Sequence, residues 1–397
     1  MASSTRTHID TLLQHTGTAA FDEVSGAAPV ALPPMRTSTV RFKDLAALDV
    51  AQKRKAAGDR VVTYGRMGMD TNAALEDVFK QLEGGTHCYL APSGLSAVTM
   101  TMLALLSAGD HALVSDNVYG PVRYLDQTVL QRLNISITYF SSQDDLEALR
   151  QDNTKLLYVE SPGSLLFEML DIPALATFAN RHGLVLAADN TWGSGYIYRP
   201  LELGAHVSVI AGTKYVGGHS DLMLGAVVTT NEAIAKKLNQ TQYAMGYAVS
   251  ADDAWLALRG VRTLPIRMTH HAASALTVCT FLESRPEVAR IHHPAWAKDP
   301  GHALWQRDCT GSNGMLAVAL KLDAERARRF VDALTLFGIG FSWGGYESLV
   351  QYVEPSTLTP HRYWNHATET LVRLHIGLEA TQDIIDDLTQ ALDRASA

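Results

Sequence analysis

Short apolar runs alternate with helical patterns between residues 63 and 256, and this alternation restricts the possible fold most strongly. The segment 93–108 carries apolar residues at helical spacing and is stopped by Gly109, so we expect a helix there and another at 172–181. Strands are predicted for the apolar runs at 111–115, 135–140, 155–160, 184–189 and 206–210. Strands that alternate with helices form right-handed crossovers in a mostly parallel sheet covered on both faces. The sequence therefore predicts an α/β fold with functional residues at the carboxyl ends of the strands.

The residues before this region have a different pattern. They combine a short helical start, a connector rich in Gly, Ala and Pro, and a polar helical segment near 42–57. Such a segment has little core of its own, so it must pack on the body of its chain or on a neighbouring subunit. We expect residues 1–62 to form an N-terminal arm.

The pattern changes again beyond residue 257. A long helix is followed by predicted strands at 314–322 and 371–376, and by an amphipathic helix at 381–394. This order is typical of a smaller α+β domain. We therefore expect a large domain at 63–256 and a C-terminal small domain at 257–397.

Composition excludes some classes of function. Hydrophobic residues make up 47% of the 397 residues, and the net charge of −8 lacks the basic surface of a nucleic-acid-binding protein. Residues 1–8 lack the apolar run of a secretory signal, and no uncharged apolar segment reaches membrane-spanning length. We expect neither a nucleic acid nor a membrane as a partner.

The cysteine and histidine residues bear on the location of the protein and on metal binding. The three cysteines are Cys88, Cys279 and Cys309. They have no CxxC spacing, which indicates reduced thiols in a cytoplasmic protein. The histidine pairs 270–271 and 292–293 are adjacent, a spacing that does not suit a metal site, so no metal is predicted.

Lys214 and Asp189 indicate a particular chemistry. Lys214 follows Thr213 and precedes two glycines, so its amine can bond to an aldehyde while the backbone approaches closely. Asp189 ends the apolar run 184–189 and can hold a pyridine nitrogen protonated. Alone, an aspartate at a strand end is more often a helix cap or a turn residue. Together the two residues predict pyridoxal phosphate, which has both an aldehyde and a pyridine ring.

Further motifs fit the same cofactor. The turn containing Gly94 and Leu95 opens the first predicted helix, whose free backbone N–H groups can hold a phosphate. Tyr119 follows a predicted strand and can stack on a flat ring. Tyr64 and Arg66 can both bind phosphate oxygens. A helix cap, a loop aromatic and two surface side chains are the simpler explanations when each motif is taken alone.

Arg373 lies inside the apolar run 371–376. A charged group in such a run needs a partner, and a substrate carboxylate is a natural bidentate partner for a guanidinium. The alternative is an ion pair with a structural role.

With these motifs in view, the chain resembles the Cys/Met-metabolism pyridoxal phosphate enzymes of fold type I. This family contains cystathionine β-lyases, cystathionine γ-lyases, cystathionine γ-synthases and methionine γ-lyases. The similarity runs from about residue 64 to about residue 379. Four matches are most similar to the bacterial β-lyases: Tyr64-Gly65-Arg66, Glu160-Ser161-Pro162-Gly163-Ser164, Asp189-Asn190-Thr191-Trp192 and Ser342-Trp343-Gly344-Gly345-Tyr346-Glu347-Ser348-Leu349.

The resemblance implies a cofactor site. Its expected members are Tyr64, Arg66, Gly94, Leu95, Tyr119, Asp189, Thr213 and Lys214. Lys214 is the lysine that bonds to the cofactor, and Tyr119 stacks on the ring. Tyr64 and Arg66 reach the phosphate in the neighbouring subunit. The active unit is then a dimer, and two dimers usually pair into a homotetramer.

The resemblance also implies a substrate and a reaction. Ser342, Trp343 and Arg373 bind the amino-acid substrate, with Ser342 and Arg373 at its α-carboxylate. Lys214 takes the Cα proton, and either Lys214 or Tyr119 protonates the leaving sulfur. The implied reaction cleaves L-cystathionine, a related cysteine S-conjugate or cystine to a thiol such as homocysteine, pyruvate and ammonia.

Two positions depart from the family pattern. Ala211 stands where many relatives have a serine, so one hydrogen bond to phosphate is lost. Ser164 stands where γ-specific relatives commonly have asparagine. The second departure favours β-elimination over the activities of a cystathionine γ-lyase, a cystathionine γ-synthase or a methionine γ-lyase.

A remote alternative is a serine hydrolase. The segment Gly340-Phe341-Ser342-Trp343-Gly344 satisfies the GxSxG pattern, with Ser342 as the nucleophile. The glycines at 344 and 345 disfavour the helix that must follow such a nucleophile.

Overall fold

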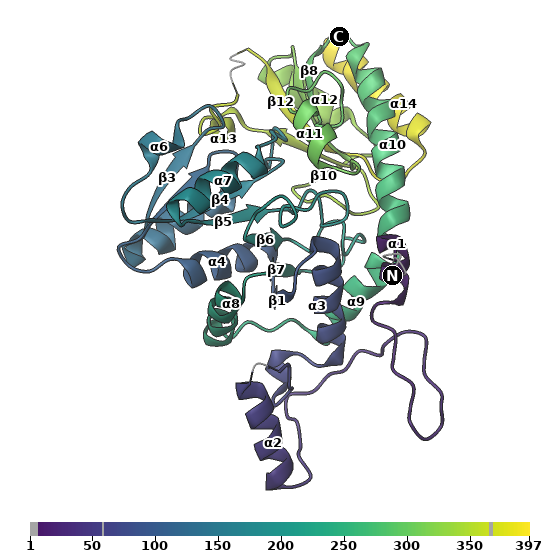
Figure 1. Ribbon diagram of the computed structural model, residues 1–397. Coiled ribbons are helices and arrows are strands. Elements are labelled where there is room, and N and C mark those ends of the chain that lie inside the picture. The colour runs from purple at the N-terminus through teal and green to yellow at the C-terminus, as the bar shows by residue number, and fades with distance from the viewer. Residues whose placement is uncertain (1–6, 58, 365–367) are drawn as a thin grey trace, which may run out of the picture.

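The computed structural model describes residues 7–57, 59–364 and 368–397 (Figure 1). Residues 1–6, which contribute to the expectation that the N-terminus holds no secretory signal, lie outside these ranges. Among the helices within the ranges, none combines the length and the apolar character needed to cross a membrane.

A seven-stranded sheet forms the centre of the molecule, in the order β1-β7-β6-β5-β4-β2-β3 (Figure 1). The strands are β1 (His87–Ala91), β2 (His111–Ser115), β3 (Ser136–Phe140), β4 (Thr154–Glu160), β5 (Val185–Asp189), β6 (Val207–Ile210) and β7 (Gly225–Thr229). The five strands β2 to β6 are parallel, whereas β7 runs antiparallel to both of its neighbours. The α/β fold with a mostly parallel sheet is confirmed, and the five predicted strands are β2 to β6.

Helices cover both faces of this sheet. The helices are α4 (Gly94–Leu105), α5 (Gly120–Leu125) and α8 (Glu232–Met245) on one face, and α3 (Asp70–Glu83) and α7 (Ile172–His182) on the other. Successive side chains of a strand point to opposite faces. Leu156 and Tyr158 of β4 therefore pack with α4 and α5, while Leu157 and Val159 pack with α7. Because both faces are buried, β4 is an almost continuous apolar run.

A second sheet of five strands lies in the C-terminal region, in the order β10-β11-β12-β9-β8. The strands are β8 (Val288–His292), β9 (Met315–Leu320), β10 (Gly338–Ile339), β11 (Leu349–Val353) and β12 (Thr370–His375). The two predicted strands are β9 and β12, which pair antiparallel, and the other three strands were missed. The helices α10 (Leu264–Glu283), α12 (Ala324–Ala333) and α14 (Thr381–Ser396) pack against this sheet.

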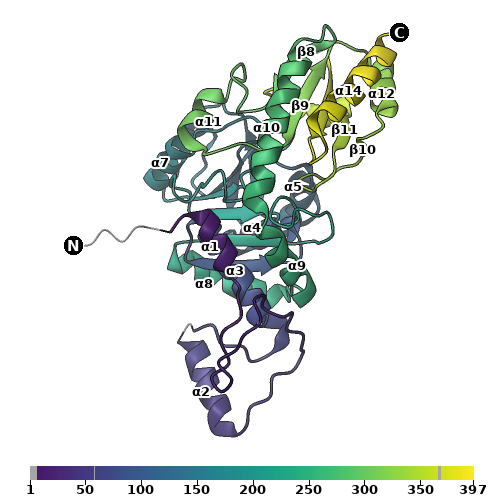
Figure 2. The same ribbon diagram turned by 90° about the vertical axis from the view of Figure 1, so that its right-hand side faces the viewer.

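The long helix α10 connects the two sheets, as both views show (Figures 1 and 2). Leu264 and Met268 in its first half belong to the core that contains α3, whereas Val278 and Leu282 in its second half belong to the core of the small sheet. The other helices are α1 (Ile9–His15), α2 (Leu45–Ala56), α6 (Leu146–Leu149), α9 (Ala251–Val261), α11 (His302–Asp308) and α13 (Pro355–Leu358), with short turns η1 (Gly65–Met67), η2 (Asp126–Leu130) and η3 (Gln131–Leu133).

The N-terminal segment extends away from the body (Figure 2). Helix α1 is attached through Leu13, which is buried in the core beside α3. Helix α2 lies at the far end of the segment, and Ala51 is its one buried side chain. The segment therefore leaves apolar side chains in solvent: Phe21, Val24, Val30, Leu45 and Val50. The domain boundaries at residues 62 and 256 stay a prediction.

A close approach between α9 and the turn after Lys214 provides a test of the packing. A Cβ atom on Gly260 of α9 would lie 2.1 Å from the backbone oxygen of Gly217. We expect Gly260→Ala to lower the free energy of unfolding by about 1–3 kcal/mol, because overpacking outweighs the better helix propensity of alanine. Gly120→Ala is the control, since a Cβ there meets nothing within 4 Å. Denaturant unfolding of both variants measures the difference, and equal stabilities would contradict the prediction.

Candidate active site

Four neighbouring strands of the large sheet bring the central candidate residues to one edge. Tyr119 follows β2, Glu160 ends β4, Asp189 ends β5, and Lys214 follows β6. In the parallel register Glu160 lies opposite Asp189. Carboxyl ends of adjacent parallel strands meet at the same edge, so residues far apart in the chain are gathered there.

Lys214 contacts a loop of the small sheet. Its Nζ donates a hydrogen bond to Ser342 Oγ at 2.8 Å and lies 5.4 Å from the centre of the Trp343 ring. Burial, together with the nearby positive charge of Arg373, lowers the pKa of Lys214 to about 8. The amine is therefore neutral in a larger fraction of molecules at neutral pH than an ordinary lysine is.

Asp189 is buried and held in one orientation. Its Oδ1 accepts hydrogen bonds from Thr191 N at 3.0 Å and Thr191 Oγ1 at 2.6 Å, and its Oδ2 accepts one from Tyr158 OH at 3.4 Å. Burial raises the pKa of Asp189, while these hydrogen bonds act in the opposite direction. A cationic group facing this carboxylate would offset the cost of burying its charge.

Glu160 is a site residue to which the sequence analysis gave no role. Its Oε2 accepts a hydrogen bond from the backbone N of Tyr119 at 2.6 Å. Burial raises the pKa of Glu160 well above its usual range, and the neighbouring Asp189 adds to this effect. Its place at the end of a predicted parallel strand was the signal that could have identified it. Burial also raises the pKa of Tyr119, so the phenol keeps its proton at neutral pH.

Arg373 approaches the site from β12 of the small sheet. It is buried, and its Nη2 donates a hydrogen bond to the backbone oxygen of Phe341 at 2.7 Å. Burial lowers the pKa of Arg373 to about 10, and the side chain is still charged at neutral pH. Within the described residues it forms no direct ion pair with an aspartate or glutamate, so the remaining guanidinium donors are open to a ligand.

The start of α4 lies beside the segment that leads to Lys214. Ser93 caps this helix, since its Oγ accepts a hydrogen bond from Ser96 N at 3.1 Å, and Gly94 and Leu95 come directly after it. A Cβ atom on Gly94 would be 2.5 Å from the Cβ of Ala211. The Thr213 hydroxyl bonds to the backbone of Leu224, donating at 3.2 Å and accepting at 2.9 Å.

Tyr64 and Arg66 are placed elsewhere in this chain. The Arg66 guanidinium lies 4.6 Å from the centre of the Tyr243 ring on α8, and its Nη1 donates to the backbone oxygen of Tyr243 at 3.2 Å. Tyr64 is half exposed on the neighbouring stretch of chain. The structure thus gathers the other candidates around Lys214. Within one subunit, Tyr64 and Arg66 do not join this group.

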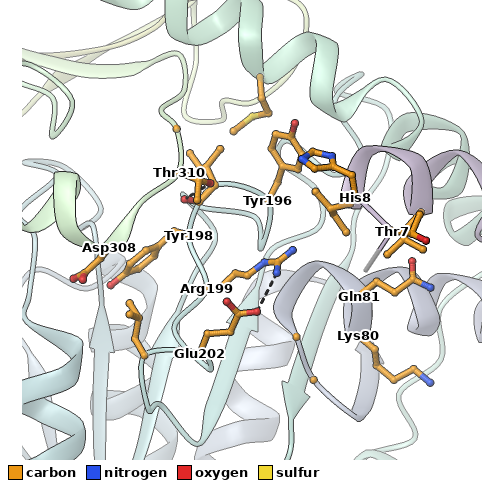
Figure 3. A pocket seen from close by; sticks show the side chains of 18 of the residues that line it. Thr7, His8, Lys80, Gln81, Tyr196, Tyr198, Arg199, Glu202, Asp308 and Thr310 are labelled. Atoms are coloured by element: carbon orange, nitrogen blue, oxygen red, sulfur yellow. Dashed lines mark hydrogen bonds and ion pairs between the residues drawn. The ribbon is translucent and has the colours of Figure 1, made fainter. Parts of the chain in front are cut away.

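A large cavity lies away from Lys214, between α1, α3 and the segment 196–203 (Figure 3). Its volume is about 1070 Å³, and its lining includes Tyr196, Arg199, Glu202 and Thr310. Arg199 and Glu202 form an ion pair at 3.0 Å, so these charges compensate each other. Size alone makes a cavity a candidate binding site, but none of the side chains gathered around Lys214 lines this one.

The residues around Lys214 fit pyridoxal phosphate. An amine with a lowered pKa suits the aldehyde, the buried Asp189 carboxylate suits a protonated pyridine nitrogen, and the start of α4 suits a phosphate. The described residues contain no group of three or more His, Cys, Asp and Glu side chains that could hold a metal ion.

Several characterised proteins are similar to this chain over nearly its whole length. A cystathionine beta-lyase of Bordetella avium is 68% identical over 396 residues, which cover 100% of both sequences. The cystathionine beta-lyase MetC of Escherichia coli (strain K12) is 36% identical, with 90% of this chain and 92% of that protein covered.

Solved structures show the same architecture. Cystathionine gamma-lyase from Lactobacillus plantarum, complexed with L-serine, superimposes with a TM-score of 0.87 at 29% identity, covering 98% of this chain and all of that one. The structure of metB from Corynebacterium glutamicum gives a TM-score of 0.86 at 31% identity, covering 98% of both chains. The predicted fold type I architecture is therefore confirmed.

The family model described as "Cys/Met metabolism PLP-dependent enzyme" matches residues 10–393. This match confirms the resemblance recognised from the motifs, and with it the requirement for pyridoxal phosphate. The chain belongs to the Cys/Met metabolism family of pyridoxal-phosphate-dependent enzymes.

Proposed function

We propose that the protein is a carbon–sulfur lyase that breaks the β-bond of L-cystathionine, or of a related cysteine S-conjugate or cystine. The relative that is 68% identical over the full length bears the name cystathionine beta-lyase. The contact between Lys214 Nζ and Ser342 Oγ carries the assignment, because it brings the amine to the motif 342–349, which matches the β-lyases. The overall reaction converts L-cystathionine and water to homocysteine, pyruvate and ammonia.

The positions of the side chains around Lys214 support a set of cofactor contacts. Lys214 would bond to the aldehyde, Asp189 would hold the ring nitrogen protonated, and Tyr119 would stack on the ring. Gly94 and Leu95 at the start of α4, together with Thr213, would hold the phosphate. When bound, pyridoxal phosphate supplies an electron sink that stabilises negative charge at the substrate Cα.

Arg373 and Ser342 orient the substrate. The Arg373 guanidinium uses one donor on Phe341 and has further donors for the α-carboxylate. Ser342 Oγ accepts from Lys214, so the hydroxyl proton of Ser342 is available to the same carboxylate. Two anchors from the small sheet thereby fix the direction of the Cα–H bond relative to the large sheet.

Proton transfer falls to Lys214 and Tyr119. The lowered pKa of Lys214 raises the fraction of neutral amine, the form that takes the Cα proton. The leaving sulfur needs a proton in return, and two groups can supply it. One is the ammonium that Lys214 has become, and the other is the phenol of Tyr119, whose raised pKa keeps it protonated.

The arrangement around Ser342 does not match a serine hydrolase. The next element after Ser342 is the strand β11, whereas a nucleophile elbow leads into a helix. Gly344, two residues later, has a left-handed φ of +86°. The Ser342 hydroxyl accepts a hydrogen bond from Lys214, the lysine that the cofactor chemistry requires, so the hydrolase alternative is set aside.

The assembly we propose is a homo-oligomer built from dimers that share their active sites, with a tetramer as the expected state. The N-terminal segment with its exposed apolar side chains, such as Phe21 and Val30, supports this proposal because a neighbouring subunit would cover them. Tyr64 and Arg66 then reach the phosphate of that neighbour. The cytoplasmic location expected from the cysteine pattern stays a prediction.

The products of L-cystathionine test the proposed function directly. We expect pyruvate, homocysteine and ammonia in equal amounts, because Ser164 and the 342–349 motif both match the β-lyases. Keto-acid analysis by chromatography distinguishes pyruvate from 2-oxobutyrate. If 2-oxobutyrate and cysteine dominate, the enzyme is a γ-lyase and the β-lyase assignment fails.

The pKa of Lys214 provides a second test. In protein freed of cofactor, reaction of Lys214 with an amine-specific reagent should accelerate with rising pH and level off above about 8, because only the neutral amine reacts. Mass spectrometry of the modified peptide follows the rate, and the exposed Lys237 of α8 serves as the comparison within the same sample. A Lys214 profile that still rises steeply at about pH 10 would show that burial does not shift its pKa.

Sharing of active sites between subunits can be tested by complementation. We expect Arg66→Ala and Lys214→Ala to be nearly inactive alone and to regain activity when mixed. In a mixed dimer one of the two sites has both Arg66 and Lys214. After random exchange of equal amounts about half of the dimers are mixed, so the activity of the sample approaches about a quarter of the normal value. Native mass spectrometry confirms subunit exchange. Mixed dimers without activity would mean that Arg66 serves its own chain.

A further inference from the structure

The loop 342–347 between β10 and β11 lies directly on the backbone of Lys214. A Cβ atom on Gly344 would be 2.9 Å from the carbonyl carbon of Lys214 and 2.8 Å from the backbone N of Tyr215. This loop also carries Ser342, which accepts the hydrogen bond from Lys214 Nζ. A displacement of the loop therefore changes the position of Ser342 relative to the reactive amine.

His375 binds this loop at two points. It is the last residue of β12, two positions after Arg373, so both side chains point to the same face of the small sheet. His375 Nδ1 donates a hydrogen bond to the backbone oxygen of Glu347 at 3.0 Å, and His375 Nε2 accepts one from Gly344 N at 3.1 Å. A carbonyl oxygen can only accept, so the proton of the neutral ring is on Nδ1 and Nε2 is free to accept.

The surroundings keep His375 in this form. The side chain is buried, and its ring centre lies 5.9 Å from that of Tyr215 and 5.2 Å from that of His271. Burial lowers the pKa of His375 well below its usual range, and the nearby His271, Arg373 and Lys214 act in the same direction. A protonated ring would have lost the acceptor that holds Gly344.

We propose that His375 is a positioning residue, which holds the loop 342–347 against the backbone of Lys214 and so sets the place of Ser342 in the site. The structural part of this inference stands on the contacts alone. Its consequence for substrate binding rests on the proposed function, in which Ser342 binds the α-carboxylate.

Hydrogen exchange of the loop in the holoenzyme tests the structural part. His375→Phe keeps a ring of similar size but removes both hydrogen bonds, so the backbone N–H of Gly344 should exchange up to about tenfold faster, as expected for the loss of one hydrogen bond. His271→Phe is the matched control, because His271 is also buried beside Tyr215 but bonds to the backbone oxygen of Ile376. We expect this control to leave exchange in the loop unchanged.

A second pair of variants separates the two ring nitrogens. The amide of His375→Gln reaches the position of Nε2 and should keep Gly344 protected. The shorter amide of His375→Asn replaces only Nδ1 and should not. Should His375→Phe fail to fold, this pair decides the question alone. Equal exchange of Gly344 in the Gln and Asn variants, or equal acceleration in the His375 and His271 variants, would overturn the proposal.

Steady-state kinetics with L-cystathionine test the consequence for the substrate. We expect KM to rise about tenfold in His375→Phe and His375→Asn, with a smaller fall in kcat, because Lys214 and Arg373 lie outside the loop 342–347 and stay in place. Rescue of KM by His375→Gln supports positioning through Nε2. An unchanged KM in a variant with faster exchange would refute the link to substrate binding. If the wild-type enzyme does not cleave cystathionine, the proposed function fails while the exchange result still decides the role of His375.

Discussion

The site depends on the parallel register of β2, β4, β5 and β6. Residues separated by about a hundred positions in the chain, Tyr119 and Lys214, come to one edge because each follows the carboxyl end of a neighbouring strand. Glu160 and Asp189 lie opposite each other in the same register. A shift of one residue in any of these strands would turn its last side chain to the other face of the sheet. The register is fixed by burial of both faces, so the packing of α4 and α7 indirectly places the site.

The small sheet completes the site from the opposite side. Its strand β12 contributes Arg373 and His375, and the loop 342–347 contributes Ser342. Helix α10 contributes side chains to the cores of both sheets, which ties the small sheet to the large one. The close contact between Gly344 and the backbone of Lys214 leaves no space for a larger residue. The distance from the Lys214 amine to Ser342 and Arg373, the residues proposed to bind the substrate, is therefore a property of packing between two sheets.

Burial gives the reactive groups their protonation states. It lowers the pKa of Lys214 to about 8 and raises that of Tyr119, so that near neutral pH the amine is neutral in a larger fraction of molecules than an ordinary lysine is, while the phenol stays protonated. The same burial raises the pKa of Glu160 and Asp189, which a cationic ring nitrogen would counteract. Once a substrate releases the Lys214 amine from the cofactor, the site has a base of lowered pKa beside a protonated phenol, as general acid–base chemistry requires.

The sequence by itself determined the strands β2 to β6 and the family, and it singled out Lys214 and Asp189 as candidates, because these depend on local apolar runs and on short motifs. It did not reveal that β7 is antiparallel, because this depends on the segment 211–224, which forms turns around Lys214 instead of a crossover helix. Short strands such as β1 and β11 were missed, since a run of only five residues is compatible with several local structures. Only the tertiary structure assigned partners to Glu160, Ser342 and His375. Their hydrogen bonds join segments that are 41, 128 and 31 residues apart, and no local pattern encodes such contacts.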